Sequence, residues 1–251
     1  MSDDIITYGQ MDFNLPHDVV TLPSGGKFYP NKKKSLKVGY LTAQDENIII
    51  SNNSRNESII NLLLKNKIYE PDVNINDLLE GDVEAILIFL RNTAFGADYN
   101  FTLKDPSTGK EFQKTVMLDE LDIITPKIEP NQNGLFELKL PKSGRLVECK
   151  LLNMGDINEL NRLSDSYPEG IVAPVVTKRL EKIIVKLDGS EDREAIAKFV
   201  NQLPMMDSKF IKNTIAECEP RLDLRRKVKA PSGEELTVRV TFGAEFFRPF
   251  F

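Results

Sequence analysis

The sequence contains no tryptophan, one histidine and two cysteines. Because His17 stands alone, a metal site built from paired histidines is excluded, and any catalytic triad would depend on this one ring. The two thiols, Cys149 and Cys218, cannot form a framework of disulfides, and neither belongs to a C-x-x-C motif. We therefore expect a reduced, cytoplasmic setting in which both cysteines are small buried apolar residues.

Long apolar runs and an excess of positive charge are also missing. No stretch approaches the roughly 18 consecutive apolar residues that indicate a membrane-spanning helix. The opening residues, MSDDIITYGQ, are acidic where a signal peptide is basic. The 33 lysines and arginines stand against 38 aspartates and glutamates, for a formal net charge of -5. Since binding to phosphates needs a cationic excess, we expect neither nucleic-acid binding nor membrane insertion.

Catalytic motifs are equally scarce. The sequence has no phosphate-binding G-x-x-x-x-G-K-[ST], no G-x-G-x-x-G and no H-E-x-x-H. Two S-x-x-K matches, Ser24 with Lys27 and Ser107 with Lys110, have the spacing of the nucleophile and base in penicillin-recognising enzymes. That chemistry needs the first turn of a buried helix, whereas both matches fall in glycine turns. We expect no enzyme, cofactor or metal site; the alternative is a hydrolase that uses Ser107 and Lys110.

What the sequence does contain is a recurring turn of proline, serine and glycine. Proline fixes φ on entry to such a turn and glycine accepts a positive φ on exit. Apolar residues alternate on both sides of the later copies, which predicts β-hairpins at 99–118, 136–152 and 226–242. The copies read TLPSGGKFYP (21–30), DPSTGKEF (105–112), LPKSGRLV (140–147) and APSGEELT (230–237).

Helical spacing is clearest in residues 81–96. Apolar residues recur there at intervals of three and four from Val83 to Ala94, and Gly96 is placed to end the helix. The remaining helical patterns include one that begins after a Thr42 cap and one that we expect Asp207 to cap. They cover residues 42–51, 55–68, 155–167, 190–204 and 207–217.

The order of these patterns predicts an α+β fold of short helices with several projecting β-hairpins, in two sub-domains. A polar segment with proline and glycine, KIEPNQNG, is the expected boundary. The predicted parts are an extended N-terminal arm at 1–20, an α+β domain at 21–126, a linker at 127–134 and a second α+β domain at 135–251.

The C-terminal residues, FGAEFFRPFF, contain five phenylalanines. An apolar cluster of this kind either enters the core or contacts a partner. We expect Phe246 and Phe247 in the core. Exposed hairpin edges can add a partner strand, guarded by Lys104, Lys110 and Lys114. The predicted partner-binding residues are Met11, Phe13 and Leu15 in the arm and Arg248, Phe250 and Phe251 in the tail.

Several motifs together resemble the baseplate hub proteins, and the related hub assembly proteins, of contractile-tailed bacteriophages of the T-even type. None of these motifs is a catalytic signature. Some relatives carry a cysteine-bearing, zinc-ribbon-like hairpin, but residues 105–109 here hold no thiol, so turn chemistry and strand pairing must shape this hairpin. The motifs are LPSGGKFYP (22–30), VGYLTAQDENIIIS (38–51), LLEGDVEAILIFLRNTAFGADYNF (78–101) and FFRP (246–249).

The resemblance implies a structural or assembly component of the tail baseplate hub. Such a protein binds other tail and hub proteins in a hetero-oligomer, with the tape-measure protein as a further candidate partner. It is made in the host cytoplasm and ends in the virion baseplate. The alternative is a transient assembly chaperone that is absent from the mature virion.

Overall fold

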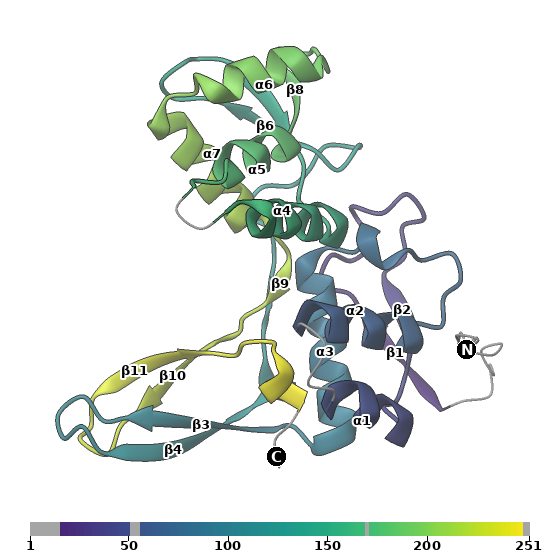
Figure 1. Cartoon of the computed structure of the whole chain (residues 1–251), viewed down its shortest axis with the longest axis vertical. Coiled ribbons are helices and arrows are strands. Elements are labelled where there is room, and N and C mark those ends of the chain that lie inside the picture. The colour runs from purple at the N-terminus through teal and green to yellow at the C-terminus, as the bar shows by residue number, and fades with distance from the viewer. Residues whose placement is uncertain (1–15, 51–55, 169–170, 248–251) are drawn as a thin grey trace.

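The computed structural model describes residues 16–50, 56–168 and 171–247. Figure 1 shows two lobes and a pair of β-hairpins that projects from them. The first lobe contains the N-terminal strands and helices, and the second contains most of the elements after residue 135. Helices alternate with small antiparallel sheets, which confirms the predicted α+β class. None of the described helices combines the length and apolar character that crossing a bilayer requires.

The first lobe is organised around one buried helix, α3, of Glu80–Phe95. Val83, Ile86 and Leu90 of this helix are buried, as the spacing predicts, and each contributes about 1.5–3 kcal/mol to folding. The helix ends at Gly96, whose φ of 83° suits glycine and whose N–H donates to the Asn92 carbonyl. The surrounding elements are β1 (His17–Thr21) paired with β2 (Ser35–Gly39), α1 (Ala43–Ile50), α2 (Asn56–Lys67) and η1 (Ile75–Asp77).

The second lobe is a three-stranded antiparallel sheet in the order β6-β7-β8, covered by helices. Its helix α5 runs directly into β8 without a glycine or proline between them, which is why neither element was predicted. The elements are β6 (Phe136–Lys139), β7 (Leu146–Cys149), α4 (Met154–Ser166), α5 (Val175–Ile183), β8 (Ile184–Leu187), α6 (Arg193–Asn201) and α7 (Met205–Cys218).

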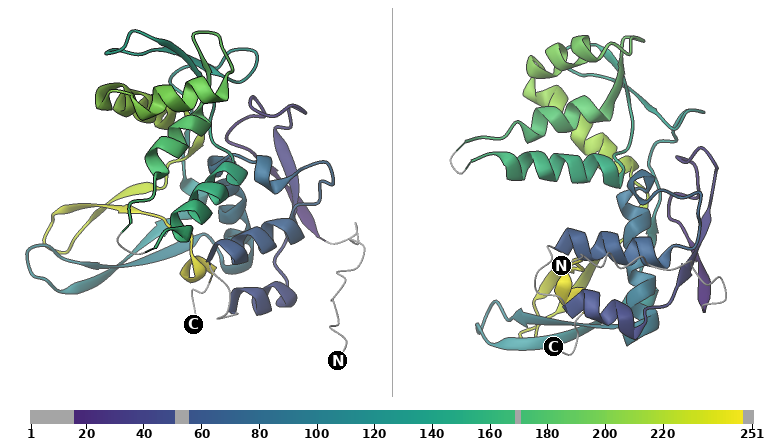
Figure 2. Two further views of the ribbon diagram at one scale, coloured as in Figure 1. Left: turned by 45° about the horizontal axis from the view of Figure 1, so that its top comes forward. Right: turned by 45° about the vertical axis from the view of Figure 1, so that its right-hand side comes forward.

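The projecting hairpins come from distant parts of the sequence. We call β3–β4 together with β10–β11 the hairpin pair; its two hairpins lie side by side in every view (Figures 1 and 2). Its apolar interior consists of Val116, Val228 and Val238, with Phe101, Leu103 and Leu236 packed against them. The strands are β3 (Asp98–Lys104), β4 (Glu111–Met117), β10 (Arg225–Lys229) and β11 (Glu235–Arg239), with η2 (Leu118–Glu120) and the short pair β5 (Ile123–Ile124) and β9 (Arg221–Leu222) between lobes and hairpins.

The end of the described chain returns to the first lobe. Phe246 and Phe247, in the short helix η3 (Ala244–Phe247), are each 1% exposed, so the prediction that they enter the core is confirmed. The Phe246 ring lies 5.7 Å from that of Tyr99, and the Arg91 guanidinium lies over the same ring. Buried apolar residues of both lobes belong to one continuous cluster. The boundary at 127–134 remains a prediction.

Two local expectations need correction. Residues 17–20, predicted as the end of an extended arm, lie in β1 and pair with β2, so they belong to the folded sheet. Asp207 does not cap a helix: α7 begins after Pro204, and the carboxylate of Asp207 accepts hydrogen bonds from another turn. Both cysteines are buried, as predicted, and burial raises the pKa of the Cys149 thiol to about 12.

Candidate interaction site

The four proline turns share one kind of backbone hydrogen bond, which spans three residues at Gly25 and Gly233 and four at Gly109 and Gly144. In each, the N–H of a glycine donates to the carbonyl of the residue before proline, and that glycine has the positive φ that a side chain would disfavour. The glycine, its acceptor and their distance are Gly25 to Leu22 at 2.9 Å, Gly109 to Asp105 at 2.7 Å, Gly144 to Leu140 at 3.0 Å and Gly233 to Ala230 at 2.9 Å.

Buried aspartates accept hydrogen bonds from other backbone N–H groups of these turns. Asp82, on α3, accepts from the Ser24 N–H at 2.9 Å and from the Tyr29 hydroxyl. Burial, and then the neighbouring Asp82 carboxylate, raise the pKa of Tyr29. Asp207, on α7, accepts from the N–H groups of Lys142 at 2.7 Å and Ser143 at 2.9 Å. A turn that is local in sequence is therefore fixed by a residue far from it.

Asp105 joins the tips of the hairpin pair. One carboxylate oxygen accepts from the Ser107 N–H of its own turn and the other from the Ser232 N–H, both at 2.9 Å. Burial alone would raise the pKa of Asp105, but these donors lower it overall. Ser107 Oγ also donates to Glu234 at 2.5 Å. The two hairpins thus meet through an apolar interior and a hydrogen-bonded tip.

The two outer faces of the hairpin pair differ in charge. On β10–β11, Arg225 lies opposite Arg239, Lys227 opposite Thr237 and Lys229 opposite Glu235, all exposed, so four cations face one carboxylate. The outer face of β3–β4 is polar with little net charge, and Thr115 there donates to Asn100 at 2.7 Å. A cationic surface on a chain of net charge -5 favours contact with an acidic partner.

The hairpin edges are also open within the described part of the chain. Each hairpin forms a two-stranded sheet of its own, and no third described strand pairs with it. Outward backbone groups at such edges can take up a partner strand. Lys104, Lys110 and Lys114, predicted as edge guards, are exposed. The hairpin pair therefore offers both an edge and a charged face to another protein.

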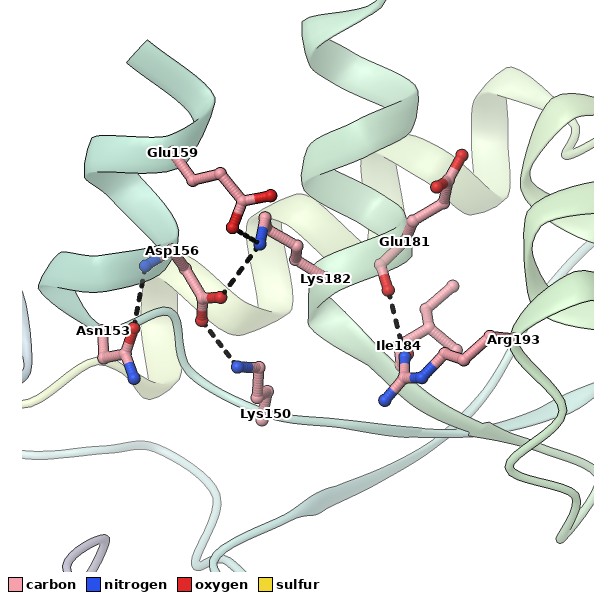
Figure 3. A network of polar contacts seen from close by, with 8 residues as sticks. All are labelled: Lys150, Asn153, Asp156, Glu159, Glu181, Lys182, Ile184 and Arg193. Atoms are coloured by element: carbon pink, nitrogen blue, oxygen red, sulfur yellow. Dashed lines mark hydrogen bonds and ion pairs between the residues drawn. The ribbon is translucent and has the colours of Figure 1, made fainter. Parts of the chain in front are cut away.

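A second polar region lies between α4, α5 and α6 (Figure 3). Asp156 accepts from Lys150 at 2.6 Å and from Lys182 at 3.3 Å, while Lys182 also reaches Glu159 at 2.6 Å. Burial would raise the pKa of Asp156, but these lysines lower it overall. Arg193 donates to carbonyl groups of Glu181 and Ile184, the latter at 3.0 Å.

This region lines a groove of about 780 Å³ with Leu160, Leu163 and Ile196 among its apolar residues. Ion pairs join Lys150, which precedes α4, and Lys182 on α5 to the carboxylates of α4, while Arg193 on α6 binds backbone carbonyl groups. Because these charges already have partners, the network stabilises the packing of the helices.

All six residues predicted to bind partners lie outside the described residues: Met11, Phe13, Leu15, Arg248, Phe250 and Phe251. Ser107 and Lys110, the pair of the alternative hydrolase, occupy the exposed tip of the β3–β4 hairpin. The charged face of β10–β11 was missed, although its sequence, RRKVK, carries the signal in alternate basic residues.

Residues 16–248 match the family described as T4 bacteriophage base plate protein. No curated protein and no solved structure matches the chain.

Proposed function

We propose that this chain, which belongs to the T4 bacteriophage base plate protein family, is a subunit of the baseplate hub that binds other tail proteins through its hairpin pair. Members of this family are structural components of the phage baseplate. The observation that carries the hub-binding role is the hairpin pair itself, with its open edges and the cationic outer face of β10–β11.

The proposed mechanism separates support from contact. The two lobes share a continuous apolar core, from which the hairpin pair projects. The Asp105 bridge keeps its two tips together, so the cationic face is presented as a unit. An acidic surface of a neighbouring tail protein then binds Lys227 and Lys229. The predicted arm and tail residues, from Met11 to Leu15 and from Arg248 to Phe251, add further contacts.

A charge-reversal experiment tests the hairpin contact. The double substitution Lys227→Glu with Lys229→Glu reverses exposed charges on β10–β11 without touching the apolar interior. The matched control, Lys198→Glu with Lys209→Glu, makes the same charge change at exposed positions on α6 and α7, away from the hairpin pair. We expect the first variant to lose at least about tenfold in binding to co-expressed baseplate proteins, and the control to retain it. Equal binding by both variants, with unchanged melting temperatures, would contradict the proposal.

Two further measurements address the rest of the proposal. Deletion of residues 248–251 is expected to abolish complex formation and to leave the fold intact, because the described core ends at Phe247.

Mass spectrometry of purified virions is expected to find the chain at stoichiometric levels. Detection only in pull-downs from infected cells would instead identify an assembly chaperone that leaves before the virion is complete.

A further inference from the structure

A cavity of about 480 Å³ lies where the first lobe, the segment after α7 and the base of the β10–β11 hairpin meet. Its floor and walls include carboxylates from two elements, and arginines stand beside them. We call it the glutamate cavity; its charged lining consists of four acids and three arginines: Glu80, Glu84, Glu219, Asp223, Arg221, Arg225 and Arg239.

Glu84 is the unusual residue of this cavity. It lies on α3 and is only 6% exposed. Among the described residues its Oε2 atom is buried without a hydrogen-bond partner. Its Oε1 atom lies 4.0 Å from the guanidinium of Arg239, which is itself largely exposed. A buried carboxylate oxygen without a donor is costly, so a native structure that keeps one calls for an explanation.

Glu219 is poorly neutralised as well. Its nearest cation is Arg221 at 3.8 Å, and the same Arg221 nitrogen donates to the Ala216 carbonyl at 2.8 Å. Burial, and then the charge of Glu80, raise the pKa of both Glu84 and Glu219 to about 7. Each carboxyl group therefore has an arginine at the limit of ion-pair distance, 4.0 Å from Glu84 and 3.8 Å from Glu219.

The two glutamates are held in place by direct backbone packing. A side-chain carbon added to Gly81 would lie 2.1 Å from the Pro220 carbonyl oxygen. Only glycine allows the start of α3 to approach the segment after α7 this closely. Glu84 and Glu219 flank this contact in sequence, so neither backbone can move away from the other without breaking it.

We infer that the glutamate cavity binds one arginine side chain of a neighbouring baseplate protein. A guanidinium carries five N–H donors in a rigid fork, which suits the pairing with two carboxylates, and Glu84 and Glu219 line the same cavity. A metal ion is a poorer occupant, because the described residues contain no group of three or more metal-ligating side chains. The source of the arginine rests on the proposed function, whereas the cation site itself does not.

Binding of small probes tests the site directly. N-acetyl-arginine amide and its uncharged isostere, N-acetyl-citrulline amide, are titrated into the full chain at about pH 7.5, with affinity measured by calorimetry. We expect the arginine compound to bind at least about tenfold more tightly. Glu84→Gln should weaken that binding by a similar factor. The control Glu194→Gln, at an exposed position on α6, should not weaken it. Equal binding of both probes, or no effect of Glu84→Gln, would overturn the inference.

A pull-down separates this site from the proposed function. If Glu84→Gln weakens both the probe and the complex with baseplate proteins, the inference holds in full. If the probe binds through Glu84 but the complex forms normally, the arginine does not come from a baseplate partner and that part of the inference is wrong. If reversing the β10–β11 charges abolishes complex formation while the probe still binds normally, the result supports the hairpin contact and leaves the cation site intact.

Discussion

Asp82 and Glu84 lie two residues apart on α3, and both are buried, yet their surroundings are opposite. Asp82 accepts from the Ser24 N–H and the Tyr29 hydroxyl. Glu84 has a buried oxygen with no partner among the described residues and only a distant arginine. A buried carboxylate with donors holds a fold together, whereas one without them costs stability and is free to bind something else.

The same contrast separates three other acids, of which Asp105 and Asp207 are buried and Glu219 is half-buried. Asp207 and Asp105 resemble Asp82, because each accepts from backbone N–H groups of a proline turn. Glu219 resembles Glu84, because its nearest cation lies 3.8 Å away. Buried charge therefore has two uses in this chain. The aspartates connect segments of the fold, and the glutamates form a cavity.

The largest effect is expected from Asp82→Ala. It leaves the Ser24 N–H and the Tyr29 hydroxyl buried without their acceptor, which should lower the free energy of unfolding by about 3 kcal/mol. Urea denaturation followed by circular dichroism measures the change. Asp77→Ala, at an exposed position just before α3, is the control and should shift stability by less than about 0.5 kcal/mol. Similar losses in both variants would show that the hydrogen bonds to Asp82 do not account for the stability lost.

A smaller effect of opposite sign is expected from Glu84→Gln. The raised pKa of Glu84 and Glu219 means that the folded chain holds protons at pH values where the unfolded chain has released them. The free energy of unfolding should therefore fall as the pH rises from about 5 to about 8.

Glu84→Gln removes one of these groups. The variant should be more stable than the parent by about 1 kcal/mol at about pH 8 and should show a flatter pH dependence. Denaturation at both pH values, with Glu194→Gln as the control, measures this. An equal slope in parent and variant would show that folding does not raise the pKa of Glu84, because a cation already compensates its charge.

The smallest effect is expected from Asp105→Ala. The bridge to Ser232 joins the tips of two hairpins that also share an apolar interior, so the global fold should persist. Hydrogen exchange of the Ser232 and Ser107 amides should become faster, while that of Ser24, held by Asp82, should not change. Unchanged exchange at Ser232 would mean that the apolar interior alone holds the tips together.

Much of the local structure could be predicted from the sequence. Proline and glycine restrict or free the backbone over only a few residues, so the turns at Gly109, Gly144 and Gly233 could be predicted from the local sequence. The apolar spacing of α3 was equally clear, and Gly96 ends it as predicted. The burial of Phe246 and Phe247 followed from their apolar character alone.

The partners of the buried acids could not be predicted. Ser24 and Asp82 are separated by 58 positions, and Asp105 and Ser232 by 127, with no local pattern that connects them. Asp207 looked like a helix cap because capping depends on nearby sequence, but its carboxylate serves a turn 64 positions away. The cavity around Glu84 arises from the packing of α3 against the segment after α7, which periodicity does not reveal.

The return of residues 225–247 to the first lobe has a consequence for synthesis. On the ribosome, β3 and β4 emerge long before β10 and β11, whose Val228 and Val238 cover Val116. The nascent chain must carry that apolar hairpin face, and the space later filled by Phe246, through the production of the entire second lobe. The first lobe is therefore complete only after nearly all described residues have been translated. A prematurely terminated product exposes an apolar surface that chaperones and proteases can recognise.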